Sequence, residues 1–100
     1  MELDQKLLEE LQNVFAQFAC IQQVILFGSR ARGDADERSD IDIAILCPTA
    51  DERDWFDITD ALDSVQTLLE IQPARYNQAS GEFRQRIEKE GIVIYESRES

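Results

Sequence analysis

The order in which helical and strand-like hydrophobic patterns follow one another restricts the fold of this chain more than any other feature of its sequence. Apolar residues recur at the spacing of one helix face in three segments, and short β-branched runs lie between these segments. The predicted elements are helices over residues 3–18, 49–69 and 80–90, and strands over residues 21–27, 41–46, 68–76 and 92–95. This alternation predicts an α/β (α+β) fold in which helices pack against a small mixed sheet.

Local signals refine some boundaries within this layout. Thr49, followed three residues later by Glu52, forms a capping-box pattern that predicts the start of the second long helix. Pro73 favours an edge position or a bulge for the third strand, because proline cannot donate a ladder hydrogen bond. The chain has 100 residues, which predicts one domain over residues 1–96 and a polar tail over residues 97–100.

Gly28 and Ser29 follow directly on the apolar run over residues 21–27, at a point where the chain must turn. A glycine there lets the backbone approach a ligand closely. The amides of the turn and the Ser29 hydroxyl can then face a phosphate group. A Gly-Ser pair alone also leaves open an ordinary tight turn with no ligand.

Asp40 and Asp42 lie on either side of Ile41 at the start of the second strand. Residues i and i+2 of a strand share a face, so the two carboxylates are predicted to lie side by side while Ile41 and Ile43 enter the core. Two adjacent carboxylates repel each other, and a bridging cation favours such a pair. Magnesium prefers oxygen ligands of this kind. The alternative is a solvated pair at the start of a half-exposed strand.

Together, residues 27–33 and 39–43 place a phosphate-binding turn and a carboxylate pair on successive strands. The sequences Phe-Gly-Ser-Arg-Ala-Arg-Gly and Ser-Asp-Ile-Asp-Ile resemble the nucleotidyltransferase superfamily of DNA polymerase beta, and its minimal nucleotidyltransferase group in particular. The motif spans about a fifth of the chain, and the layout and length agree over nearly all of it. The resemblance therefore implies the nucleotidyltransferase fold.

The resemblance also implies a substrate and a cofactor. A nucleoside triphosphate, expected to be ATP, would lay its phosphates on Gly28 and Ser29. Asp40 and Asp42 would hold Mg²⁺, expected as two ions, which would orient the α-phosphate and offset charge on the leaving pyrophosphate. The implied reaction is nucleotidyl transfer to a hydroxyl group.

A third acidic residue on a following strand completes the metal site in the family. Glu70 is the candidate here, both as a metal ligand and as the base that takes the proton from the acceptor hydroxyl. An alignment shifted by two residues would place Gln72 in that position instead, and glutamine cannot act as a base or neutralise a cation. Glu70 could also be an ordinary exposed carboxylate.

Arginine and aromatic side chains near the motif have several possible roles. Arg30 and Arg32 are predicted to pair with triphosphate oxygens and also to offset nearby acidic residues, whereas Arg38 is interpreted as a surface residue. Trp55 and Phe56 are predicted to pack between helix and sheet rather than to stack on a nucleobase.

Composition excludes several classes of function. The net charge is −11, which disfavours direct binding of nucleic acid and favours a basic protein partner, although it could serve solubility alone. No histidine occurs, so Ser-His-Asp and Cys-His catalytic systems are excluded. Cys20 and Cys47 have no metal-ligand spacing and are predicted to be reduced, buried residues of a cytoplasmic protein. No apolar run is long enough to cross a membrane.

Larger members of the family carry a further domain that binds the acceptor, and a chain of this length is expected to have no room for one. The resemblance therefore implies that the acceptor site comes from a second protein. A small helical HEPN-type protein is the expected partner, and transfer of AMP to one of its tyrosines would make this chain an antitoxin. Self-association is another way to complete the acceptor site. Two other functions stay open: a catalytically weak nucleotide-binding module that neutralises a partner by contact, and a small-molecule nucleotidyltransferase of the aminoglycoside-modifying type.

Overall fold

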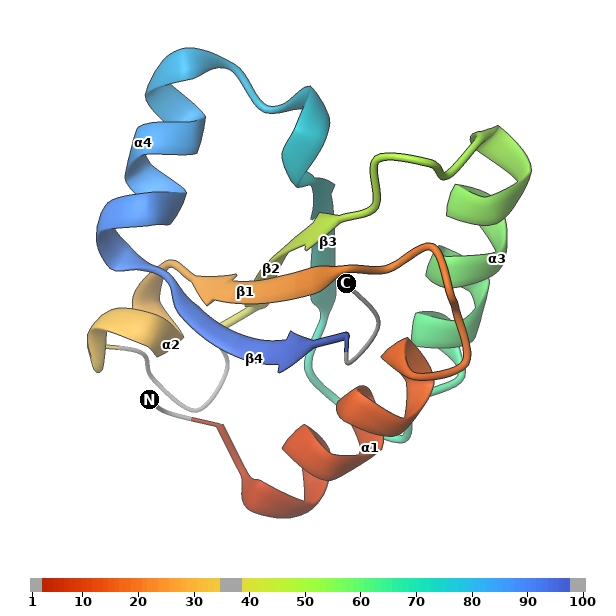
Figure 1. Cartoon of the computed structure of the whole chain (residues 1–100). Helices are drawn as coiled ribbons and strands as arrows, with labels where there is room; N and C mark the ends of the chain where they lie inside the picture. The colour runs from red at the N-terminus through yellow and green to blue at the C-terminus, as the bar shows by residue number, and fades with distance from the viewer. Residues whose placement is uncertain (1–2, 35–38, 98–100) are drawn as a thin grey trace.

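A mixed four-stranded sheet with helices on both faces forms the body of the protein (Figure 1). The computed structural model describes residues 3–34 and 39–97. In chain order the elements are α1 (Gln5–Phe15), β1 (Gln23–Phe27), α2 (Ser29–Arg32), β2 (Ile41–Leu46), α3 (Glu52–Asp63), β3 (Ile71–Arg75), the short 3-10 helix η1 (Tyr76–Gln78), α4 (Gly81–Glu90) and β4 (Ile92–Glu96). The predicted order of helices and strands and the mixed sheet are confirmed.

The strands lie in the order β3-β2-β1-β4. β1 pairs antiparallel with both β2 and β4, and β2 pairs parallel with β3. β3 is therefore an edge strand, as Pro73 predicted, because a proline is tolerated where one side of the strand lacks a partner. Since β2 and β3 run in parallel, the crossover between them needs a long connection, and α3 provides it.

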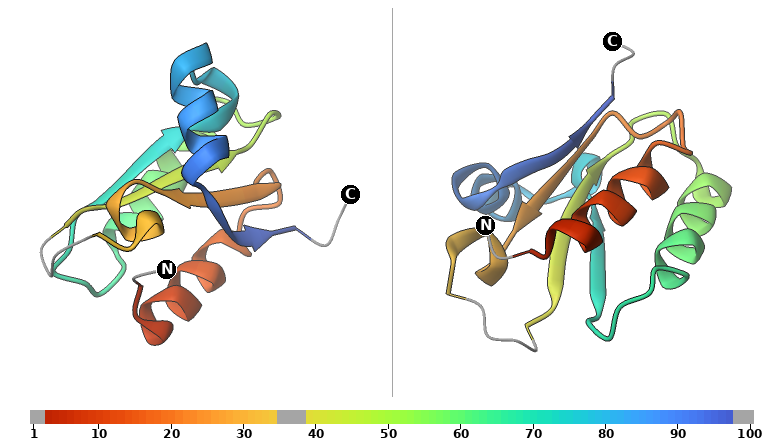
Figure 2. Two further views of the ribbon diagram at one scale, coloured as in Figure 1. Left: turned by 90° about the vertical axis from the view of Figure 1, so that its left-hand side faces the viewer. Right: turned by 90° about the horizontal axis from the view of Figure 1, so that it is seen from below.

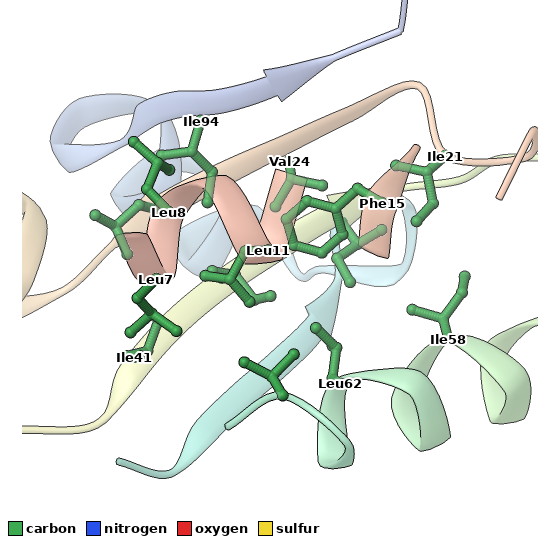
Figure 3. Packing of buried hydrophobic residues seen from close by; sticks show 14 of the residues in the cluster. Leu7, Leu8, Leu11, Phe15, Ile21, Val24, Ile41, Ile58, Leu62 and Ile94 are labelled. Atoms are coloured by element: carbon green, nitrogen blue, oxygen red, sulfur yellow. The ribbon is translucent and has the colours of Figure 1, made fainter. Parts of the chain in front are cut away.

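One face of the sheet carries most of the hydrophobic core. Residues of α1 and α3 pack there against β1 and β2, and Ile21, Phe15 and Leu11 are fully buried. Figure 3 shows α1 and α3 meeting over this face. α4 covers the opposite face, where Ile87 packs on Ile25, Phe27 and Ala44. The side view of Figure 2 separates α4 from α1 across the sheet. This second core is much smaller than the first.

The start of α3 differs from the prediction. The capping box is formed by Asp51 and Asp54, not by Thr49 and Glu52. The Asp51 carboxylate accepts a hydrogen bond from the Asp54 amide at 2.8 Å, and the Asp54 carboxylate accepts one from the Asp51 amide at 3.1 Å. Aspartate is a stronger N-cap than threonine, which explains why the helix begins two residues later.

The end of α3 also differs from the prediction, and so does the length of β3. α3 ends at Asp63, because the chain turns there to reach the start of β3, and the helical spacing of Val65 and Leu69 continues only in the connecting loop. β3 is shorter than the predicted strand over residues 68–76. The first helix and strand are likewise shorter than predicted, at residues 5–15 and 23–27.

The two aromatic residues at the start of α3 have different environments. Trp55 packs against the main core as predicted, and the Arg75 guanidinium lies 5.3 Å from its ring centroid. Phe56 is 63% exposed, so its predicted packing role is wrong. The helix places these neighbouring side chains about 100° apart, and only one of them can face the sheet.

The cysteines are both free: Cys47 is buried as predicted, whereas Cys20 is only half-buried. Within residues 3–34 and 39–97, no helix has the length and apolar character required to span a bilayer.

Candidate active site

The predicted site forms where β1 ends and β2 begins. The antiparallel register pairs Phe27 with Asp42, so Gly28 follows immediately beside the Asp42 side chain. Gly28 has a φ of +78°, a left-handed conformation that favours glycine. A Cβ atom at this position would lie 2.6 Å from Oδ2 of Asp42. The predicted turn and the carboxylate pair are therefore direct neighbours.

Gly28 and Ser29 begin the short helix α2. The amides of Ala31 and Arg32 both donate to the Gly28 carbonyl at 3.1 Å. Ser29, at the first helical position, is half-exposed and lies next to the space that a Gly28 side chain would occupy. This geometry is compatible with the predicted contact between the Ser29 hydroxyl and a phosphate.

Replacing Ser29 with alanine should weaken ATP binding only modestly. The loss of one hydroxyl contact is worth about 1 kcal/mol, which corresponds to about a fivefold increase in Kd. Isothermal titration calorimetry with Mg²⁺ and ATP measures this change. An unchanged Kd would mean that the hydroxyl makes no contact with the nucleotide.

Asp40 and Asp42 differ in their surroundings. Ile41 and Ile43 are fully buried in the main core, so the alternation along β2 places Asp42 on the opposite face, the one that α4 covers in part. Asp42 is half-buried, whereas Asp40 lies just before the strand and is exposed. Burial raises the pKa of the Asp42 carboxyl above its ordinary value of 3.8, and repulsion by Asp40 raises it further. Placing ionised Asp42 here therefore has an energetic cost.

The site is compatible with Mg²⁺ in its donor atoms. Two carboxylates lie near each other, and among the described residues the Asp42 carboxylate makes no hydrogen bond or ion pair. Gly28 places no side chain beside Oδ2 of Asp42, where a Cβ atom would lie only 2.6 Å away. Residues 40 and 42 are thus the ones that would hold the ion.

The third predicted carboxylate is less well placed. β2 and β3 align Asp42 with Gln72, whereas the Glu70 carbonyl accepts a hydrogen bond from the Ile41 amide at 2.9 Å, so Glu70 lies opposite Asp40. Across residues 3–34 and 39–97, no three acidic, cysteine or histidine side chains come close enough to hold one ion together. The structure therefore brings Asp40 and Asp42 together and places Glu70 opposite Asp40, but the three side chains do not form one metal-binding cluster.

The two arginines of the motif have different environments. Arg30 is buried, and its guanidinium donates two hydrogen bonds to the Ser39 carbonyl, at 3.0 Å and 2.9 Å. These bonds tie α2 to the segment that leads into Asp40. Arg32 is more exposed and pairs with Asp34 at 3.2 Å. Its predicted contact with phosphate stays a prediction, and Arg38 lies outside the described residues.

Sequence reasoning missed two residues of α4. Arg32 also pairs with Glu90 at 3.1 Å, and Glu90 in turn pairs with Arg86 at 3.5 Å. Arg86 and Arg32 both act on Asp42, since their positive charges partly counter the rise of its pKa. No local motif marks Arg86, and only the packing of α4 over the end of β1 brings it to the site (Figure 2).

The structure thus combines a mixed sheet, a glycine turn and a carboxylate pair at the start of β2. The family model described as polymerase beta nucleotidyltransferase matches residues 9–100. The chain belongs to this family, as the sequence motif predicted.

A relative from Methanocaldococcus jannaschii is named as a candidate protein adenylyltransferase. It is 35% identical to this chain over 78 residues, which cover 74% of this chain and 79% of the relative.

Solved structures support the fold. A toxin–antitoxin structure with AMP-PNP is similar to this chain, with a TM-score of 0.74 and 22% identity. The match covers 91% of this chain and 74% of the other chain. A complex of the tri-AMPylated Shewanella oneidensis HEPN toxin with its MNT antitoxin matches 96% of this chain and 75% of its own, with a TM-score of 0.65 and 22% identity. A nucleotidyltransferase-like protein of Sulfolobus solfataricus matches 95% and 82%, with a TM-score of 0.59 and 23% identity. At these identities the likeness establishes the fold alone.

Proposed function

We propose that this chain transfers AMP from ATP to a hydroxyl group of a partner protein and acts as the antitoxin of a small helical HEPN-type toxin. The observation that carries the proposal is the close approach of the Gly28 turn to the Asp42 carboxylate, since a Cβ atom at position 28 would lie only 2.6 Å from Oδ2 of Asp42. This arrangement lets the amides of the turn and the Asp42 carboxylate face one ligand. It suits a phosphate group with its counterion.

The reaction requires a new bond and a leaving group. The acceptor oxygen bonds to the α-phosphorus of ATP, the bond to the bridging oxygen breaks, and pyrophosphate leaves. The Gly28 and Ser29 turn positions the phosphates. Mg²⁺ held by Asp40 and Asp42 would offset the negative charge of the phosphates when it is bound. The proton of the acceptor hydroxyl goes to a carboxylate, for which we propose Glu70, at the position opposite Asp40 just before β3.

Two comparisons support a protein as the acceptor. The M. jannaschii relative carries the name of a protein adenylyltransferase, and the S. oneidensis complex contains an AMPylated HEPN toxin bound to an MNT antitoxin. The net charge of −11 complements a basic partner surface.

Co-expression with the HEPN-type protein of the same host tests the proposal. Intact-mass analysis of the partner should show added AMP when the parental chain is present, and a tyrosine-to-phenylalanine variant at the modified position should show none. Purified components should require both ATP and Mg²⁺. A partner that is bound but never modified would contradict transfer.

Glu70 and Gln72 can be separated by two substitutions. Glu70→Gln should leave ATP binding largely intact and lower the rate of AMP transfer by about a hundredfold, the scale for loss of a general base. Gln72→Ala should cost far less, since an amide cannot accept the proton. A radiolabelled transfer assay under single-turnover conditions gives both rates. If Glu70→Gln transfers AMP at the parental rate, the base lies elsewhere.

A second candidate function rests on one specific observation. Gln72, not a carboxylate, is the residue that the strand register places beside Asp42. A site with only two close carboxylates would bind nucleotide yet catalyse weakly, and the chain would then neutralise its partner by contact alone. In that case, Asp42→Asn should still protect cells from the toxin.

A further inference from the structure

Helix α4 presents a stripe of side chains to the site that the proposed mechanism does not use. Phe83, Arg86 and Glu90 lie within one face of α4, at helical spacings of three and four residues. Phe83 packs edge-on against Phe27, with ring centroids 5.5 Å apart. Because Phe27 pairs with Asp42 and precedes Gly28, this contact fixes the stripe beside the candidate phosphate site.

A single carboxylate oxygen holds two arginines together at this place. Oε2 of Glu90 lies 3.1 Å from Nη1 of Arg32 and 3.5 Å from Nε of Arg86. Arg32 belongs to α2, directly after the Gly28 turn, and Arg86 belongs to α4. The Glu90 side chain is only 20% exposed, so it is the most buried member of this group of three charged residues. Two guanidinium groups from different elements thus meet at Glu90, beside the candidate site.

The geometry of Arg86 leaves its outer end available for a ligand. Its contact with Glu90 uses Nε, and within the described part of the chain neither terminal amino group has a hydrogen-bond partner. The side chain is 58% exposed, so a solute can reach it. A guanidinium held at Nε can still donate two hydrogen bonds from its terminal nitrogens, which matches two oxygens of a phosphate.

The surrounding charge makes this convergence unusual for an ordinary surface. The chain has 21 acidic and 10 basic residues, so most of its surface repels anions. Arg32 and Arg86 nevertheless lie close enough to Asp42 for their positive charges to act on its carboxylate. An anion with several charges would meet the two guanidinium groups as it approaches the carboxylate pair.

We propose that Arg86 is a substrate-binding residue that, together with Arg32, contacts the pyrophosphate part of ATP, the leaving group of the reaction. The inference rests on the proposed nucleotide site and adds a residue from α4 to it. Both guanidinium groups contact the same oxygen of Glu90, so both can contact one chain of phosphates. This contact would favour ATP over AMP, because AMP lacks the pyrophosphate.

The test compares Arg86→Ala with Arg84→Ala. Arg84 lies on the other side of α4, where its guanidinium stacks over the Tyr76 ring at 4.8 Å, so it controls for loss of a positive charge on the same helix. Calorimetry with Mg²⁺ should show that Arg86→Ala raises the Kd for ATP by about tenfold to thirtyfold. The Kd for AMP should change by less than about twofold, and Arg84→Ala should change neither by more than about twofold. Arg86→Lys, which keeps the charge but not the fork, should be intermediate.

Each other outcome has a definite meaning. Equal effects of Arg84→Ala and Arg86→Ala on ATP binding would overturn the proposal, since only overall charge would then matter. Equal losses for ATP and AMP would overturn the assignment to pyrophosphate. If the parental chain binds ATP and Arg86→Ala binds it equally well, the inference fails while the proposed function stands. If the parental chain binds no ATP, both fail.

Discussion

Replacing Gly28 with valine should abolish ATP binding. The φ of +78° is strained for a residue with a side chain, and the first side-chain carbon would lie 2.6 Å from Oδ2 of Asp42. Left-handed strain of about 1–2 kcal/mol and overpacking of about 1–3 kcal/mol would displace either the turn or the carboxylate. The expected rise in Kd exceeds about a hundredfold, and calorimetry in the presence of Mg²⁺ measures it.

Two other glycines provide controls. Gly33, at the end of α2, also has a positive φ of +87°, so Gly33→Ala tests the effect of backbone strain at the other end of this helix. Gly81 has open space around its Cα, so Gly81→Ala tests a neutral substitution. Both variants should bind ATP within about threefold of the parental chain. A Gly28→Val protein that folds and binds ATP normally would exclude the turn as the phosphate site.

Replacing Asp42 with asparagine should remove AMP transfer almost completely. A metal ion at a phosphoryl group is worth several kcal/mol of transition-state stabilisation, so loss of its half-buried ligand should lower the rate by about a thousandfold. The variant should also lose the joint stabilisation by Mg²⁺ and ATP. In the parental chain, thermal-shift titration should show that the two ligands together raise Tm more than either does alone. Equal stabilisation by ATP in EDTA would contradict a metal at this pair.

Without ligands, Asp42→Asn should be as stable as the parental chain or more stable. The pKa of Asp42 is raised in the folded state, so the folded chain binds the proton up to a higher pH than the unfolded chain does. Ionised Asp42 therefore lowers the free energy of unfolding at neutral pH, and this effect disappears as the pH falls through its folded-state pKa towards 3.8. The gain in Tm should be largest at neutral pH and shrink in acid. Asp57→Asn makes the same chemical change at an exposed position of α3, away from the site. It is the matched control for the loss of AMP transfer.

The parts of the site that are close in sequence could be predicted from the sequence. Gly28, Asp40 and Asp42 belong to one strand–turn–strand segment, and the period of two along β2 fixes the face of each side chain. The buried isoleucines on either side of Asp42 confirm this alternation. Local pattern was sufficient because the strands pair with each other.

The parts that depend on packing could not be predicted. The helical spacing continues past Asp63, but α3 ends there because the chain has to reach the start of β3. Whether Glu70 or Gln72 lies beside Asp42 depends on the register of two parallel strands, and no hairpin turn links them to set that register. The position of Arg86 could not be predicted either, because its approach to Arg32 depends on how α4 packs on the sheet.

The continuity of the β1–β2 segment also has a consequence for the order of folding. Gly28 and Asp42 are separated by residues 29–41, whereas Gln72 follows Asp42 only after the longer crossover through α3. Each doubling of loop length adds about 0.6 kcal/mol to the entropy cost of closure, and parallel pairing is slow for the same reason. We therefore expect the β1–β2 hairpin, with its turn and its carboxylate pair, to form before β3 docks. A nascent chain would then acquire the phosphate turn and the carboxylate pair before the rest of the sheet is complete.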